Sequence, residues 1–464
     1  MSTEGKRTER DSMGEMEVPA QAYYGATTQR AVLNFPISGL RIPGRMIRAL
    51  GLIKWAAAGT NGELGLVPAK LADAVARAAE EVADGKLDDE FVIDVFQTGS
   101  GTSSNMNANE VIANRAAELL GGKRGDRELV HPNDHVNHGQ SSNDVIPTAV
   151  HLAALLAIRE DLEPGVRLLR EELDRKAEEF WDVIKTGRTH LQDATPIRLG
   201  QVFRGYAGQM ERAGRRIERA REELSEVALG GTAVGTGINT HPEFASRTCR
   251  KISERTGLAI RESENHFQAQ STLDGVVAAS SELRTIALSL LKIANDVRLL
   301  GSGPRTGLRE LAIPEVQPGS SIMPGKVNPV IAESAIMVAA QVLGNDQAIV
   351  QAGEWSFFEL NTMLPLAAHN LVQSIELLGA ATKNFAEKCV RGTTATDVGP
   401  NMVTRGLAIV TGLVPQIGYD RAAAIAHEAA TTGKSIREVA EEQTELSAAE
   451  LDAALDPFKM TRPE

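Results

Sequence analysis

The sequence predicts a mainly α-helical protein built around a bundle of long helices. Aromatic residues make up only 4% of the 464 residues, while alanine and leucine are abundant. We therefore expect an aliphatic core of helices packed on helices. Between residues 145 and 390, about five stretches longer than roughly 20 residues carry apolar side chains at helical spacing. Long helices in this order are typical of a bundle whose connecting loops gather at its ends.

Shorter elements flank the predicted bundle. Before it we expect an extended arm with a short hairpin over residues 11–40, followed by helices over 45–64, 69–83 and about 107–120. A long helix begins near Val145, and Glu163-Pro164 is expected to break the helical pattern before the next one. These stretches predict three domains: an N-terminal mostly helical domain over 1–138, a central helix-bundle domain over 139–392 and a small C-terminal helical domain over 393–464.

Charge and composition exclude several classes of partner. With 49 basic and 61 acidic residues the net charge is −12, which argues against nucleic acids and anionic membranes. No apolar run is long enough to cross a bilayer, and residues 1–10 lack the apolar core of a signal peptide. Cys249 and Cys389 lie far apart without a C-x-x-C pair. We therefore expect no disulfide framework, no cysteine-based zinc site and a reducing cytoplasm.

The loop over residues 319–329 carries the most informative polar pattern. Its two glycines and two prolines exclude a helix or a central strand, and a proline-free apolar stretch follows from 330 to 352. Two hydroxyls, an ammonium and an amide without any acid predict anion binding at a helix N-terminus: Ser320, Ser321, Lys326, Asn328. The glycine spacing and Val327 exclude a nucleotide-binding P-loop. A plain surface loop between helices is the alternative.

Other polar stretches also precede helices. The hydroxyl and amide run over 96–107 suits a carboxylate or phosphate, although an N-cap with a solvated loop explains it equally well. Residues 131–138 hold three histidines, but Pro132 interrupts a helix there and H-E-x-x-H is absent, so we expect no metal site. Residues 141–144 are expected to cap a long helix, and 187–196 to form a polar turn.

These polar stretches together resemble the fumarase/aspartase superfamily, and within it the class II fumarases. The similarity covers nearly the whole chain and rests on these segments: S-G-T-S-S-N-M-N, H-P-N-D-H-V-N, S-S-N-D, G-R-T-H-L-Q-D-A-T-P, G-G-T-A-V-G-T-G and G-S-S-I-M-P-G-K-V-N-P. The resemblance implies a three-domain helical fold with a central five-helix bundle. It also implies a homotetramer with active sites shared between subunits, fumarate and L-malate as substrates, and no metal or organic cofactor.

The resemblance also implies roles for individual residues. Ser320 matches the base, while Lys326 and Asn328 match groups that stabilise the charge of an aci-carboxylate intermediate. His190 matches the residue that binds or activates water, and Glu333 matches the carboxylate that orients it. Residues that match contacts to the substrate carboxylates are Ser100, Thr102, Ser141, Ser142, Asn143, Thr189 and Ser321. A second, non-catalytic anion site is matched by His131, Asn133 and Asp134, although Glu128–Val130 stand where some relatives have a basic pair.

Other interpretations remain open from the sequence. Aspartate ammonia-lyase shares the fold, and Gln192 with Val316-Gln317 looks aspartase-like, whereas Thr195-Pro196 and residues 239–244 look fumarase-like. A non-catalytic protein on the same scaffold is a third interpretation, which the intact motif residues oppose. His190 is alternatively a core histidine, and Glu333 is alternatively a helix first-turn charge that responds to the helix dipole.

Overall fold

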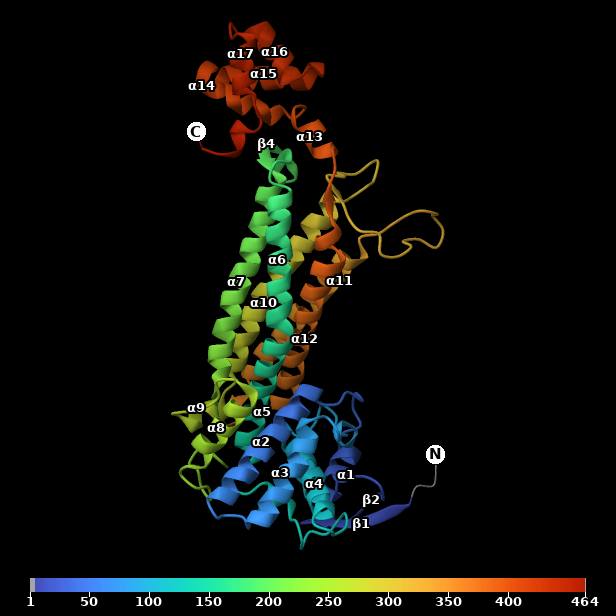
Figure 1. The fold of residues 1–464 in the computed structure, drawn as a ribbon, viewed down its shortest axis with the longest axis vertical. Coiled ribbons are helices and arrows are strands. Elements are labelled where there is room, and N and C mark those ends of the chain that lie inside the picture. The colour runs from blue at the N-terminus through green and yellow to red at the C-terminus, as the bar shows by residue number, and fades with distance from the viewer. Residues whose placement is uncertain (1–4, 464) are drawn as a thin grey trace. The chain divides into compact units, whose positions relative to one another are not determined.

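The computed structural model describes residues 5–463, and these residues are mostly α-helical (Figure 1). The predicted mainly α class is confirmed. Residues 1–4 of the predicted N-terminal domain lie outside the described range. The long helices fall where the apolar spacing predicts them: α6 (Glu163–Glu179), α7 (Leu199–Ser225), α10 (Asp274–Leu300), α11 (Val330–Gly353) and α12 (Leu364–Lys388).

The chain divides into two compact units, each made of segments that are separate in the sequence. Unit 1 contains residues up to 163 together with 215–287 and 340–379, and unit 2 contains 164–214, 288–339 and 380–464. All five long helices have residues in both units, α6 only through Glu163. The three sequential domains remain a prediction.

Unit 1 begins with a hairpin and continues with helices. Strands β1 (Lys6–Asp11) and β2 (Gly14–Pro19) pair antiparallel, with Lys6 opposite Pro19. The chain then forms α1 (Ala26–Asn34), where an extended arm was predicted. The predicted helices follow as α2 (Gly44–Glu63) and α3 (Ala69–Ala83). These two helices pack so closely that a Cβ added at Gly51 would lie 2.5 Å from the backbone nitrogen of Ala83.

Two helices of unit 1 begin earlier than predicted. The helix expected from residue 107 is α4 (Thr102–Leu119), and the helix expected from Val145 is α5 (Ser142–Ala157). Both starts consist of polar residues that apolar periodicity does not detect, because they cap the helix or form its first turn. The predicted break at Glu163-Pro164 is wrong, since a π-helical turn over Ile158–Leu162 carries the chain into α6. Pro164 lies in the first turn of α6 and has no backbone N–H to donate, so the π-helical turn before it marks the place where the regular α-helical hydrogen bonds are interrupted.

Unit 2 contains a second hairpin that the sequence did not predict. Strands β3 (Ile184–Thr189) and β4 (Gln192–Arg198) pair antiparallel with a bulge at Gly187, where only a polar turn was expected. His190 and Leu191 form the two-residue connection with φ angles of +56° and +60°. Glycine, asparagine and aspartate usually occupy such positions, so two other residues here indicate strain of the kind that clusters at functional sites.

The C-terminal part of unit 2 has its own small core. Its main helices are α13 (Val398–Val403), α15 (Tyr419–Thr432), α16 (Ile436–Gln443) and α17 (Ala448–Ala454). Leu413, Ile425, Val439 and Leu451 pack together there without solvent exposure. Within residues 5–463, no helix combines the length and apolarity that a bilayer crossing requires.

Candidate active site

The first predicted site residues lie in unit 1, where a tight loop leads into α4. A Cβ added at Gly99 would lie 1.8 Å from the carbonyl oxygen of Thr362, and Gly101 has a φ of +72°. Both positions therefore favour glycine. The resulting turn brings the hydroxyl oxygens of Ser100 and Thr102 to 2.8 Å from each other. These two side chains form a pair of neighbouring hydroxyl groups at the start of α4.

The start of α5 supplies the next group. Ser141 and Asp144 form a capping box, in which the Ser141 hydroxyl accepts from the Asn143 backbone at 3.2 Å and Asp144 accepts from the Ser141 backbone at 2.9 Å. The fully buried Asp144 carboxylate also accepts from the backbone N–H groups of Gly230 and Thr232 at 3.1 and 2.9 Å. Burial raises the pKa of Asp144 against these stabilising contacts. The glycine-rich stretch near residue 230 therefore anchors the start of α5.

Asn105 joins these two groups. Its Nδ2 donates to Ser142 Oγ at 3.0 Å and to Asn137 Oδ1 at 3.2 Å. Asn137 in turn accepts from the buried Lys54 on α2 at 2.8 Å. We call the predicted carboxylate contacts Ser100, Thr102, Ser141, Ser142 and Asn143 the carboxylate clamp. The sequence analysis missed Lys54, Asn105 and Asn137, although a single lysine inside the apolar stretch 49–58 was a signal.

Thr189 and His190 lie in unit 2, at the tip of the β3–β4 hairpin. Both are exposed. The base of this hairpin is held by Glu310, whose carboxylate lies 3.1 Å from Lys185 Nζ and 2.7 Å from Arg188 Nη2. Lys185 and Glu310 are buried, and burial lowers the pKa of Lys185. The ion-pair cluster therefore fixes the strand that presents the exposed imidazole.

The loop over 319–329 contains residues that were predicted to be catalytic, and we call it the catalytic loop for that reason. It also lies in unit 2 and folds on itself. Ser320 Oγ accepts backbone hydrogen bonds from Met323 at 2.8 Å and from Ile322 at 3.3 Å. Gly319 N donates to the Lys326 carbonyl at 2.9 Å, and a Cβ added at Gly319 would lie 2.5 Å from that carbonyl oxygen. Asn328 Nδ2 donates to the Gly319 carbonyl. Two backbone N–H groups thus point at Ser320 Oγ, and no such contact distinguishes Ser321 in the described part of the chain.

The remaining predicted groups of unit 2 are not brought together in the described chain. Lys326 is exposed, and within residues 5–463 its ammonium group makes no hydrogen bond or ion pair. Glu333 lies half-buried in the first turn of α11. Over the same range no hydrogen bond or ion pair joins Glu333 to His190. The predicted contact through which Glu333 orients His190 is therefore not seen within one described chain.

The predicted second anion site contains a cation that the sequence analysis overlooked. His131 caps a π-helical turn over Pro132–Val136, and its Nδ1 accepts from the Asp134 backbone at 3.1 Å. Arg127 Nη2 lies 2.9 Å from His131 Nε2. Burial and Arg127 lower the pKa of His131. His131, Asn133 and Arg127 share a cavity of about 420 Å³ with Arg10. No group of three or more His, Cys, Asp or Glu within residues 5–463 is placed to hold a metal ion.

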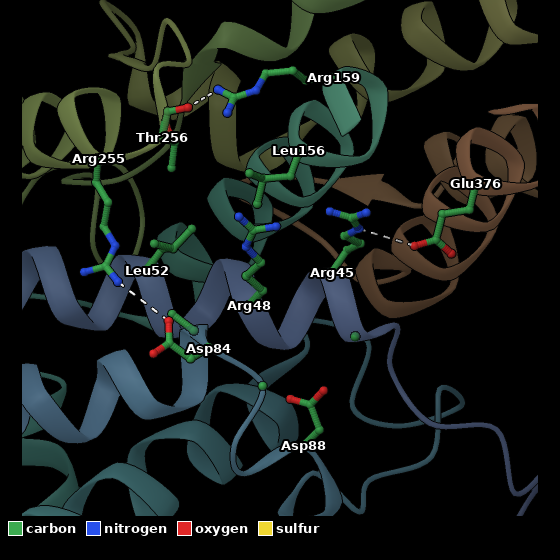
Figure 2. A pocket seen from close by; sticks show the side chains of 13 residues that line it. Arg45, Arg48, Leu52, Asp84, Asp88, Leu156, Arg159, Arg255, Thr256 and Glu376 are labelled. Atoms are coloured by element: carbon green, nitrogen blue, oxygen red, sulfur yellow. Dashed lines mark hydrogen bonds and ion pairs between the residues drawn. The ribbon is translucent and has the colours of Figure 1, made fainter. Parts of the chain in front are cut away.

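A separate cavity of about 570 Å³ in unit 1 is rich in arginine (Figure 2). Four guanidinium groups point towards it, but each already contacts a carboxylate or a carbonyl: Arg45 with Asp161 and Glu376, Arg48 with Glu160, Arg159 with the Thr256 carbonyl, and Arg255 with Asp84. None of the predicted site residues lines this cavity. Its charges are therefore paired, in contrast to Lys326.

Comparisons with known proteins identify the family. A family model described as lyase matches residues 14–344, and one described as the fumarase C C-terminus matches 409–462. The chain is 57% identical over 460 residues to a class II fumarate hydratase of Halobacterium salinarum, covering 99% of this chain and 98% of the relative. The chain belongs to the class II fumarate hydratase family.

A second relative and a solved structure show the same similarity in sequence and in fold. The mitochondrial fumarate hydratase of Danio rerio is 49% identical and matches 100% of this chain and 91% of its own length. The solved class II fumarase of Schistosoma mansoni is 40% identical, covers 99% of this chain and 100% of its own, and gives a TM-score of 0.96. The predicted family and fold class are confirmed.

Proposed function

We propose that this lyase catalyses the reversible hydration of fumarate to L-malate. The observation that carries the proposal is the environment of Ser320, whose Oγ faces two backbone N–H groups in a loop that also contains Lys326. A serine hydroxyl becomes an effective base only when its alkoxide is stabilised. Backbone N–H donors and a nearby ammonium provide that stabilisation once water is excluded.

The chemistry follows from malate. Ser320 removes a weakly acidic C–H proton next to a carboxylate, and the electron pair moves onto that carboxylate to give an aci-carboxylate. Lys326 and Asn328 supply the positive charge and the donor that stabilise this dianionic group. Asn328 donates to the Gly319 carbonyl in the described conformation, so its amide must leave that partner before it contacts substrate.

We propose His190 as the group that binds the attacking water and protonates the leaving hydroxyl in reverse. Its exposed position at the hairpin tip supports this role, because the imidazole is free to meet a ligand. Glu333 is proposed to orient His190. The carboxylate clamp, with Thr189 and Ser321, is proposed to bind the substrate carboxylates, because its hydroxyls and amides match the hydrogen-bonding needs of a dicarboxylate.

A homotetramer that shares its active sites between subunits is proposed from the family resemblance. Large apolar side chains on the long helices support it, since Leu288, Leu299 and Met337 are 47%, 45% and 66% exposed. Apolar side chains on long helices are usually covered by a partner. A cytoplasmic location is also proposed, which the free thiols of Cys249 and Cys389 support.

A weaker second anion site is proposed at His131, Asn133 and Asp134. Arg127 supports it by placing a guanidinium next to His131, one position before the residue where some relatives carry a basic pair. Within residues 5–463 the Arg127 guanidinium donates to the Arg10 carbonyl and forms no ion pair with a carboxylate. An anion could therefore bind Arg127 without breaking an ion pair.

One assay tests the proposed reaction against the ammonia-lyase alternative. The purified protein is given fumarate in water, fumarate with ammonium, L-malate or L-aspartate. We expect malate formation from fumarate that does not depend on ammonium, and fumarate formation from malate. Turnover of aspartate alone would overturn the proposal in favour of an ammonia-lyase. Absence of any turnover by a folded oligomer would favour a non-catalytic protein on this scaffold.

A further inference from the structure

Lys54 is an unusual buried group that the proposed mechanism does not use. It lies in α2 among apolar residues and has no solvent exposure. Its Nζ donates to Asn137 Oδ1 at 2.8 Å and to Gln140 Oε1 at 3.0 Å. Burying an amine is costly unless each N–H finds an acceptor, so a core lysine that holds one particular loop needs an explanation.

The two amide side chains that Lys54 contacts have only one sensible orientation. Because Lys54 donates, the side-chain oxygens of Asn137 and Gln140 must face it. The opposite ends of both amides then find backbone acceptors, since Asn137 Nδ2 donates to the Gln140 carbonyl at 3.2 Å and Gln140 Nε2 to the Val136 carbonyl at 3.1 Å. Lys54 therefore fixes the direction of the Asn137 amide.

Asn137 in turn fixes the direction of Asn105. Asn137 Oδ1 accepts from Asn105 Nδ2 at 3.2 Å, and the same Nδ2 donates to Ser142 Oγ at 3.0 Å. Asn105 Oδ1 is buried without a hydrogen-bond partner among residues 5–463. A flipped Asn105 would relieve that oxygen by accepting the Ser142 proton, but it would set two amide oxygens against each other at Asn137. The Lys54 contact is what makes the flip unfavourable.

We propose that Lys54 is a positioning residue which, through Asn137 and Asn105, keeps the Ser142 hydroxyl proton free to donate to a substrate carboxylate. An amide nitrogen only donates, so Ser142 Oγ accepts from Asn105 and its own proton points elsewhere. With Asn105 flipped, Ser142 would present lone pairs to the carboxylate and repel it. The inference rests on the proposed role of the clamp in fumarate binding.

This role depends on donation by the amine, not on a fixed charge. Burial lowers the pKa of Lys54 to about 7, while the nearby Asp144 carboxylate acts to raise it. The ammonium and the neutral amine both carry N–H groups, so either form holds the two amide oxygens. Replacement by methionine keeps the length and apolar stem of the side chain and removes all of its donors.

The test is a double-mutant cycle of Lys54→Met and Ser142→Ala in the full-length oligomer. The KM for fumarate, the kcat and the dissociation constant of succinate, a dicarboxylate that cannot be hydrated, are measured for each variant. We expect K54M to raise KM and the succinate dissociation constant roughly tenfold in the wild-type background, and hardly at all when Ser142 is already alanine. The kcat is expected to change much less, because the proton-transfer groups are untouched. Lys70→Met, an exposed lysine of α3, is the matched control and should change none of these values.

Equal effects of K54M in both backgrounds would overturn the proposal, as would a K54M variant that loses thermal stability but keeps the wild-type KM. If K54M fails to fold, Asn105→Asp gives a second test. Its carboxylate accepts only, so it must take the Ser142 proton, and we expect succinate binding to weaken by tenfold or more. Unchanged succinate binding in N105D would exclude the proposed effect of Lys54 on Ser142 through Asn137 and Asn105. A wild-type protein without hydratase activity would contradict the proposed function separately, because succinate binding still reports on Lys54.

Discussion

The carboxylate clamp and the catalytic loop differ sharply in how they are held. The clamp begins two helices, where the Ser141 backbone donates to the buried Asp144 and the Ser142 hydroxyl accepts from the buried Asn105. Asn137 connects Asn105 to the buried Lys54. The catalytic loop is exposed over most of its length, with Ile322 84% exposed, and is held mainly by a few hydrogen bonds within itself. Rigid donors suit binding of a fixed carboxylate geometry, whereas a loop with few contacts can close when substrate arrives.

This difference predicts that substitutions in the catalytic loop reduce turnover, whereas substitutions of the buried residues that hold the clamp reduce stability or substrate binding.

The largest effect is expected from Ser320→Ala. Loss of the proposed base is expected to lower kcat for malate dehydration by about a thousandfold, with an unchanged melting temperature. Ser321→Ala is the matched control and is expected mainly to raise KM. Near-normal kcat in S320A would remove Ser320 as the base.

Asp144→Ala tests the clamp side. The change removes a buried carboxylate that accepts from three backbone N–H groups and leaves those donors unpaired. We expect the free energy of unfolding to fall by about 3 kcal/mol. Denaturant or thermal unfolding followed by circular dichroism measures the loss. If D144A were as stable as the wild type and lost only kcat, the division between the two regions would be wrong.

Lys326→Met tests whether an exposed, unpaired ammonium acts only when substrate is bound. Without the Lys326 ammonium the aci-carboxylate intermediate loses one charged hydrogen-bond donor, and kcat/KM is expected to fall by about a hundredfold. Because the Lys326 ammonium makes no ion pair or hydrogen bond among residues 5–463, the melting temperature should stay the same. Steady-state kinetics and calorimetry on the same preparation provide both readouts, and a lowered melting temperature would show a structural role.

A smaller effect is expected from pH. Burial lowers the pKa of Lys54 to about 7, below its value in an unfolded chain. Above pH 7 the unfolded chain therefore binds more protons than the folded one, so the free energy of unfolding contributed by Lys54 rises with pH. Between pH 7 and 8.5 the gain is about 1–2 kcal/mol. We expect wild type to gain this stability relative to K54M, and a pH-independent difference would contradict the lowered pKa.

The fold was largely predictable because apolar periodicity survives along the long helices. The bounds of α3 and α11 follow from that periodicity almost unchanged. The starts of α4 and α5 were placed too late because their first turns consist of polar residues. The β3–β4 hairpin was missed because Gly187 and Pro196 indicate a turn, and its pairing depends on a register that local composition does not encode.

The candidate site was predictable in its residue types but not in its connections. Resemblance alone separated Ser320 from Ser321, and the structure supplies a physical reason, namely the two N–H groups that face Ser320 Oγ. Lys54 and Asn105 escaped prediction because their roles depend on contacts between residues far apart in the sequence. Arg127 escaped prediction because it lies in a non-helical turn four residues before His131, and no motif position records the contact between the two side chains.

The tip of the β3–β4 hairpin has a consequence for engineering. His190 and Leu191 both hold left-handed backbone angles, each of which costs on the order of 1 kcal/mol for residues with a Cβ. A selection for heat resistance alone is therefore expected to favour glycine or asparagine at Leu191, which is 78% exposed and has little packing to lose. The added backbone freedom of glycine would also make the orientation of the neighbouring His190 imidazole less fixed. Directed evolution of this enzyme should thus screen thermostability and turnover together, because at this turn the two properties are expected to improve at each other's expense.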